Sequence, residues 1–107
     1  MYLIGYNHCM FKAYKTEIFS KWHDSLKDLK GKIAIARRID RAEKGNFGDS
    51  EPVGESVFEM RIDFGPGYRV YYTLKGNEII ILLCGGNKSS QKRDIDKAKE
   101  MAREYKQ

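Results

Sequence analysis

Four side chains that can bind anions or transfer protons alternate with apolar residues on either side of a short turn. Glu59 and Arg61 precede the turn Gly65–Gly67, and Arg69 and Tyr71 follow it. Because successive side chains of a strand point to opposite faces, a hairpin at this turn places all four on one face. A guanidinium group is a planar fork that matches phosphate oxygens, so the pattern favours binding of a nucleic-acid backbone.

Lys88 extends the same positive surface, because it follows the third predicted strand of the sheet on a glycine-rich turn. An ordinary solvent-facing sheet is the alternative. Glu59 and Arg61 then form a simple surface ion pair. Asp63 and Arg69 form another. The pattern of residues alone leaves both interpretations open.

Periodicity predicts the elements that must position these residues. In order, they are a strand over residues 11–15, a helix from Thr16 to about Gly31, a second helix that ends at Gly45, a loop over 46–55, strands over 57–64, 68–74 and 79–84, and a last helix after Ser89 or Ser90. This order predicts an α+β fold, in which an N-terminal strand and a helical hairpin join an antiparallel sheet and a C-terminal helix. We expect all helices to cover one face.

The strand pattern also assigns the two faces of the sheet. The side chains expected to face the helices are Phe58, Met60, Ile62, Val70 and Tyr72. The opposite face, which carries the polar residues, is expected to be open and concave. Trp22 is expected in the core, and Cys84 is expected to be a small buried hydrophobe.

Composition narrows the class of protein. The chain has 107 residues and a net charge of +5, which predicts one domain over residues 11–107, preceded by an extension over 1–10. No apolar run approaches the roughly 20 residues that cross a bilayer, and the N-terminus has no secretory signal pattern, so we expect a cytoplasmic protein without membrane contact. Cys9 and Cys84 lie far apart without metal-ligand neighbours, so no metal or other cofactor is expected.

Three motifs, in this order, resemble those of a known family. They are GNFGD at residues 45–49, GPGYRVYY at 65–72, and LLCGGNKSSQ followed by RDI within 82–95. From about Met10 to Met101 the chain resembles the RelE/ParE toxin superfamily, specifically the HigB/RelE-like addiction module killer proteins of its phage-related branch. The resemblance implies two N-terminal helices on a twisted antiparallel sheet with a C-terminal helix, in agreement with the predicted order.

The resemblance implies a type II toxin that cleaves messenger RNA in the ribosomal A site. Such enzymes use no metal or cofactor: the ribose 2′-hydroxyl attacks the adjacent phosphate and leaves a cyclic phosphate and a 5′-hydroxyl. By position, Arg69 matches the family arginine that holds the scissile phosphate, Arg61 a basic residue of the preceding strand, and Lys88 the basic residue after the last strand. The family's C-terminal tyrosine has no counterpart here, which leaves the general base open between Glu59 and Tyr71.

Partners follow from the same resemblance. It implies a cognate antitoxin, often a helix-turn-helix protein, and messenger RNA on the ribosome as substrate. Operator DNA is expected to be contacted only through the antitoxin. Two alternatives stay open: a ParE-like inhibitor of DNA gyrase, because one fold serves two targets in this superfamily, and an inactive protein that binds its antitoxin and takes part in autorepression.

Overall fold

The computed structural model describes residues 10–105. Apart from Met10, the extension expected over residues 1–10 lies outside the described residues. The elements are β1 (Lys12–Lys15), α1 (Glu17–Ser25), α2 (Leu29–Glu43), β2 (Ser50–Gly54), β3 (Val57–Ile62), β4 (Tyr68–Lys75), β5 (Ile79–Asn87), the 3₁₀ turn η2 (Lys88–Ser90), α3 (Gln91–Ala102) and the 3₁₀ turn η3 (Arg103–Tyr105). The predicted α+β class is confirmed.

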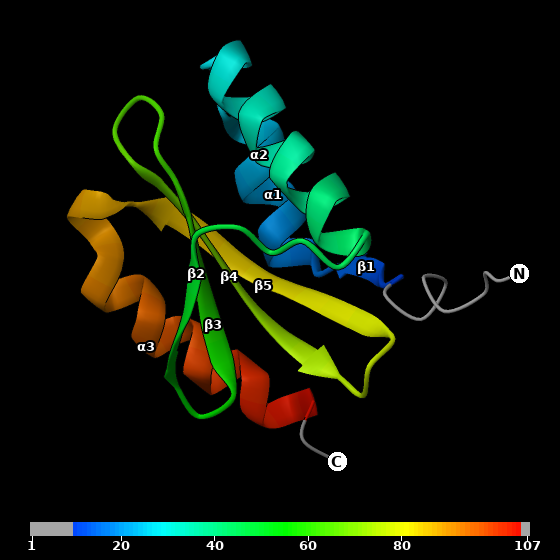
Figure 1. Ribbon diagram of the computed structural model, residues 1–107. Coiled ribbons are helices and arrows are strands. Elements are labelled where there is room, and N and C mark those ends of the chain that lie inside the picture. Colours follow the sequence, from blue (N-terminus) through cyan, green and yellow to red (C-terminus); the bar gives the residue numbers. More distant parts are fainter. Residues whose placement is uncertain (1–9, 106–107) are drawn as a thin grey trace, which may run out of the picture.

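One five-stranded sheet organises the fold, with strand order β1-β5-β4-β3-β2. Strands β2 to β5 pair antiparallel, whereas β1 runs parallel to β5, so the sheet is mixed rather than purely antiparallel. The α1–α2 hairpin and the meander separate β1 from β5 in the chain, and this long connection lets the two strands run in the same direction. Figure 1 shows α1 and α2 packed together on one side of the sheet.

The expectation that all helices cover one face is wrong, because α3 packs on the other face (Figure 1). The face toward α1 and α2 holds the expected side chains, including Met60, Ile62 and Val70, together with Phe19 and Ile35. On the opposite face a second apolar cluster joins the strands to α3. Its buried members are Val57, Tyr71, Ile81, Leu83, Cys84, Ala98 and Ala102. The sheet is therefore covered in part on both faces.

The first helix begins as predicted but ends earlier. Thr16 is the N-cap: its hydroxyl accepts a hydrogen bond from Phe19 N at 3.1 Å and donates one to the Leu83 carbonyl at 2.8 Å. The helix ends at Ser25 instead of near Gly31, because Asp28 caps a new helix by accepting from Gly31 N at 3.0 Å. The two helices are thus separated by a short extended segment.

The predicted loop over 46–55 contains an edge strand, β2, which the sequence did not indicate. Pro52 lacks a backbone donor and Gly54 has a φ of 108°, and both features are tolerated at a sheet edge with a bulge. The strand predicted to reach Phe64 ends at Ile62. Among residues 10–105, no helix is long and apolar enough to cross a membrane.

Candidate functional site

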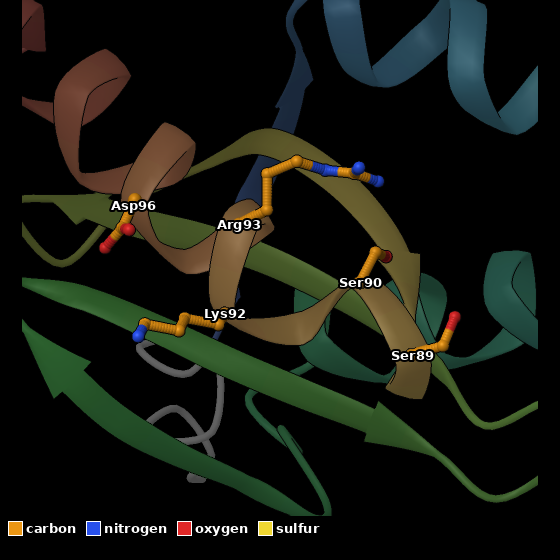
Figure 2. Close-up of a pocket in the computed structure, with 5 residues that line it drawn as sticks. All are labelled: Ser89, Ser90, Lys92, Arg93 and Asp96. Atoms are coloured by element: carbon orange, nitrogen blue, oxygen red, sulfur yellow. The ribbon is translucent and has the colours of Figure 1, made fainter.

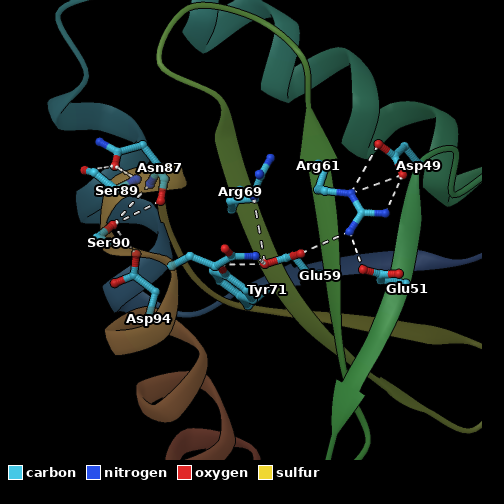
Figure 3. Close-up of polar contacts among 11 residues, drawn as sticks. Asp49, Glu51, Glu59, Arg61, Arg69, Tyr71, Asn87, Ser89, Ser90 and Asp94 are labelled. Carbon is cyan, nitrogen blue, oxygen red and sulfur yellow. Dashed lines mark hydrogen bonds and ion pairs between the residues drawn. The ribbon is translucent and has the colours of Figure 1, made fainter.

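The register of β3 and β4 brings the candidate residues together. Arg61 lies directly opposite Arg69, and Glu59 lies directly opposite Tyr71 (Figure 3). All four side chains therefore share one sheet face, as alternation along the strands predicts. This is the face that α3 covers in part, so the surroundings of each side chain depend on how close it lies to the helix.

Glu59 and Tyr71 are buried, because α3 lies over them. The Tyr71 hydroxyl donates to Glu59 Oε2 at 3.0 Å, and Gln91 Nε2 of α3 donates to the same oxygen at 2.7 Å. Burial, and then the charge of Glu59, raises the pKa of Tyr71 well above its usual range. The expectation that this face is open is therefore wrong at Glu59 and Tyr71, whose side chains are both buried.

Arg61 is held by carboxylates on both sides. Its guanidinium contacts Asp49 Oδ1 at 2.8 Å and Glu59 Oε1 at 3.4 Å, and it also hydrogen-bonds Glu51 (Figure 3). The hydrogen bond with Asp49 contributes most to raising the pKa of Arg61, and the hydrogen bond with Glu51 contributes next. The bond from Arg61 in turn lowers the pKa of Asp49. The ion pair between Glu59 and Arg61 that the alternative interpretation proposed is present, although Glu59 is buried.

Arg69 is much less well paired. Its Nε lies 3.9 Å from Glu59 Oε2, which is too long for a hydrogen bond. Among the described residues, this Nε is a buried side-chain nitrogen without a hydrogen-bond partner, and the side chain is only 12% exposed. The pair with Asp63 is not among the ion pairs within residues 10–105. Arg69 therefore keeps unused hydrogen-bonding capacity.

Lys88 lies close to Arg69 across the turn before β4. A Cβ added at Gly67 would lie 3.4 Å from Lys88 Cβ and 4.0 Å from Arg69 Nη1, so both residues border this glycine. Lys88 is exposed, and within residues 10–105 its side chain forms no ion pair or hydrogen bond. Asn87 fixes the following turn by accepting from Ser89 N at 2.9 Å.

Two close contacts determine the path of residues 84–87, Cys-Gly-Gly-Asn, at the end of β5. A Cβ at Gly85 would lie 2.2 Å from Trp22 Cζ3, and one at Gly86 would lie 1.9 Å from Asp94 Oδ2. Only glycine leaves room for the indole of α1 on one side and the first turn of α3 on the other. The predicted core role of Trp22 is consistent with its packing in the apolar cluster. These contacts place Lys88 at the end of β5.

The GNFGD loop is built around Arg38 of α2. This side chain donates to the carbonyls of Arg61 at 2.5 Å, Phe47 at 3.2 Å and Asp49 at 3.3 Å. A Cβ at Gly48, whose φ is 62°, would lie 2.9 Å from Arg38 Nη2. The loop therefore needs glycine at this position, and Arg38 fixes the backbone from which Asp49 reaches Arg61.

Sequence reasoning missed four residues of this network: Arg38, Asp49, Glu51 and Gln91. Asp49 belongs to a motif that carries the family resemblance, but its partner was not evident from spacing. Gln91 ends another of those motifs, but its contact with Glu59 depends on the sheet face that α3 covers. Arg38 and Glu51 gave no signal in the sequence.

A surface hollow of about 600 Å³ lies beside this region, at the start of α3. Its lining residues are Ser89, Ser90, Lys92, Arg93 and Asp96 (Figure 2). Lys92 and Arg93 extend in different directions from the helix in Figure 2. Within residues 10–105, no group of three or more His, Cys, Asp or Glu side chains is placed to hold a metal ion.

The fold and the placement of these residues define a class. Two helices on one face of a five-stranded mixed sheet and a C-terminal helix on the other are consistent with the RelE-like fold. A family model described as "Phage derived protein Gp49-like (DUF891)" matches residues 19–106, and the chain belongs to this family. The Gp49-like family is RelE/toxin-like, which gives the chain a toxin–antitoxin context.

The chain is also similar to a protein of comparable length. An uncharacterized protein of Haemophilus influenzae is 48% identical over 89 residues, which cover 83% of this chain and 90% of that protein. The similarity therefore extends over nearly the whole of both chains.

Proposed function

We propose that this protein is the toxin of a type II toxin–antitoxin system, of the HigB/RelE kind, and that it cleaves messenger RNA on the ribosome. The observation that carries the proposal is the pair Arg69 and Lys88, which border one glycine turn and lack strong carboxylate partners within residues 10–105. Cationic donors of this kind are what a scissile phosphate requires.

The proposed reaction is transesterification without a metal. The 2′-oxygen bonds to the adjacent phosphorus while the bond from phosphorus to the 5′-oxygen breaks, so the products are a 2′,3′-cyclic phosphate and a 5′-hydroxyl. One proton leaves the 2′-hydroxyl and one reaches the departing 5′-oxygen. Negative charge grows on the phosphoryl oxygens, and Arg69 and Lys88 are assigned to stabilise it.

Glu59 and Tyr71 take a different role in this proposal. Both were candidates for the general base, but the Glu59 carboxylate already accepts bonds from Tyr71 and Gln91, and Tyr71 is buried. We assign Glu59 to positioning the two arginines and Tyr71 to holding Glu59. In this proposal, neither Glu59 nor Tyr71 is the general base, and other groups transfer the protons.

The partners belong to the proposal as well. A cognate antitoxin, of the helix-turn-helix kind, is proposed to hold the toxin inactive and to carry any contact with operator DNA. Messenger RNA bound to cytoplasmic ribosomes is the proposed substrate. No cofactor is part of the proposed reaction.

The test is expression without antitoxin from a tightly controlled promoter. We expect growth arrest, with new 5′ ends in translated messages that carry a hydroxyl and are ligated only after phosphorylation. Arg69→Ala should lower cleavage by about 100-fold or more, the usual effect of losing one transition-state donor. Arg37→Ala, an exposed arginine of α2, is the matched control and should keep full activity. Cuts that persist at full level in Arg69→Ala would overturn the assignment.

A ParE-like inhibitor of DNA gyrase is the second candidate, and the burial of both base candidates, Glu59 and Tyr71, is the observation that favours it. The same expression strain separates the two functions. Induction of the DNA-damage response with intact messenger RNA favours gyrase, whereas the cuts described above favour RNA. Absence of any growth effect from a folded protein favours an inactive antitoxin-binding repressor.

A further inference from the structure

The cations of the candidate site are accompanied by carboxylates of the same chain. Three cations lie on or beside this sheet face, namely Arg61, Arg69 and Lys88, and three carboxylates accompany them, namely Asp49, Glu51 and Glu59. All three carboxylates contact Arg61. A phosphate that approaches Arg61 therefore meets an arginine already occupied by anions.

The three carboxylates differ sharply in exposure. The Glu59 side chain is 1% exposed, whereas Asp49 is 59% exposed and Glu51 is 54% exposed. A buried carboxylate cannot leave its cation without losing its compensation, but exposed carboxylates are readily solvated by water when they separate from an arginine. Asp49 and Glu51 can therefore be exchanged for another anion, and Glu59 cannot.

The position of the two exposed carboxylates in the fold permits this exchange. Glu51 lies on β2, an edge strand that pairs with β3 alone among the described strands, and Asp49 lies in the loop just before it. Arg38 fixes the loop backbone through the Asp49 carbonyl, so the carboxylate can rotate away while the chain stays in place. Neither movement requires a change in the core.

We propose that Asp49 and Glu51 are internal competitors for Arg61 that occupy the place of an RNA phosphate, and that a phosphodiester of single-stranded RNA displaces them. The inference rests on the proposed function and divides its binding site into two parts. Arg69 and Lys88 have no close carboxylate to displace within residues 10–105, so they can bind the RNA from the start. Arg61 joins them only after the exchange, so Asp49 and Glu51 set the affinity of the site for polyanions.

In this exchange, one phosphodiester replaces two carboxylates on the N–H donors of the same guanidinium group. Carboxylates and phosphodiesters both accept two parallel hydrogen bonds from a guanidinium group. No covalent bond forms or breaks. The cost is the loss of the Asp49 and Glu51 contacts, and the gain is a contact with the RNA backbone.

The experiment compares binding of a fluorescent, uncleavable 2′-O-methyl RNA oligonucleotide to three proteins by anisotropy. The test variant is Asp49→Asn with Glu51→Gln. The matched control is Glu17→Gln with Glu55→Gln, which also removes two negative charges and breaks two exposed ion pairs, those with Lys21 and Arg103. We expect the test variant to bind roughly three- to tenfold more tightly than the control, the scale expected from two exposed ion pairs.

The Arg61→Ala change tests whether the tighter RNA binding of the test variant depends on Arg61. In the wild-type background it should weaken binding, because the RNA loses this contact and three carboxylates lose their cation. In the test variant it should in addition remove the gain. The dependence of log affinity on log salt should then fall by about 0.7, the value for one phosphate contact on a single strand. Thermal unfolding checks that each variant is folded, and Glu51→Gln alone serves if the double variant is not.

Failure of the inference and failure of the proposed function have different signatures. If the wild type cuts messenger RNA but the test variant binds no more tightly than the control, or no variant binds the oligonucleotide, the inference is overturned and the proposed function stands. If the wild type neither cuts messenger RNA nor binds RNA, the proposed function fails and the inference fails with it.

Discussion

The Tyr71 hydroxyl donates a 3.0 Å hydrogen bond to Glu59 Oε2, and both side chains are buried under α3. Gln91 of that helix donates to the same oxygen. The buried carboxylate is thus fixed by one neutral donor from β4 and one from α3, while its ion pairs reach Arg61 and Arg69. The contact between two strands and a helix sets where the two guanidinium groups lie.

Tyr71→Phe is expected to weaken the fold and to leave the chemistry nearly intact. The change removes one buried hydrogen bond, which should lower the free energy of unfolding by about 1 kcal/mol in urea titrations. Single-turnover cleavage should change by less than about tenfold, because the hydroxyl does not reach the substrate. Tyr14→Phe, at an exposed tyrosine, is the control and should alter neither quantity. A loss of activity near 1000-fold without loss of stability would make Tyr71 a catalytic group.

Glu59→Gln tests whether the buried carboxylate positions the arginines or takes the proton. Removing the charge leaves Arg69 without its nearest carboxylate, so we expect a loss of about 3 kcal/mol in the free energy of unfolding. A positioning role predicts slower cleavage with an unchanged shape of the pH–rate profile. Disappearance of the acidic limb of that profile would instead identify Glu59 as the general base.

Arg38→Ala should loosen the loop that carries Asp49. The variant loses donors to three carbonyls, which predicts destabilisation of about 1–3 kcal/mol. The amide of Arg61, which donates to the Asp49 carbonyl at 2.9 Å, should exchange its hydrogen faster. Arg37→Ala, at the exposed neighbouring position, should leave both quantities unchanged. Equal exchange rates in the two variants would argue against the role given to Arg38.

The shared face of Glu59, Arg61, Arg69 and Tyr71 could be predicted because alternation along two strands and a recognisable turn fix it. The burial of two of these residues could not. The apolar stripe of α3 shows that this helix packs against something, but not which face of the sheet it covers.

The carboxylates around Arg61 were beyond sequence reasoning for a different reason. Asp49 and Glu51 lie 12 and 10 positions from Arg61 in the chain, and they meet it only because β2 pairs with β3. Pro52 and Gly54 made this strand unpredictable, because both residue types are depleted in strands and their presence favours a loop. Contacts that depend on a weak edge strand leave little trace in local periodicity.

Gly86→Ala should be destabilising because its new methyl group would lie 1.9 Å from Asp94 Oδ2. Overpacking of this kind costs about 1–3 kcal/mol. Combining it with Asp94→Ala should cost less than the sum of the two single changes, since the second removes the clashing carboxylate. Gly76→Ala is the control for backbone strain alone, because that glycine has a φ of 62° and no atom within 4 Å of the added methyl group. Strict additivity at residues 86 and 94 would contradict the clash.

Stability should fall at alkaline pH because of the buried tyrosines. Burial raises the pKa of Tyr71, and also of Tyr68 and Tyr72, so the native state keeps protons that the unfolded chain releases near pH 10. Their contribution is complete below about pH 10 and is lost as the pH rises above it, at up to about 1.4 kcal/mol per pH unit for each tyrosine. Urea titrations from pH 8.5 to about 11 check the slope. Tyr71→Phe should flatten it and Tyr14→Phe should not, so equal slopes in these two variants would show that Tyr71 does not retain its proton in the native state.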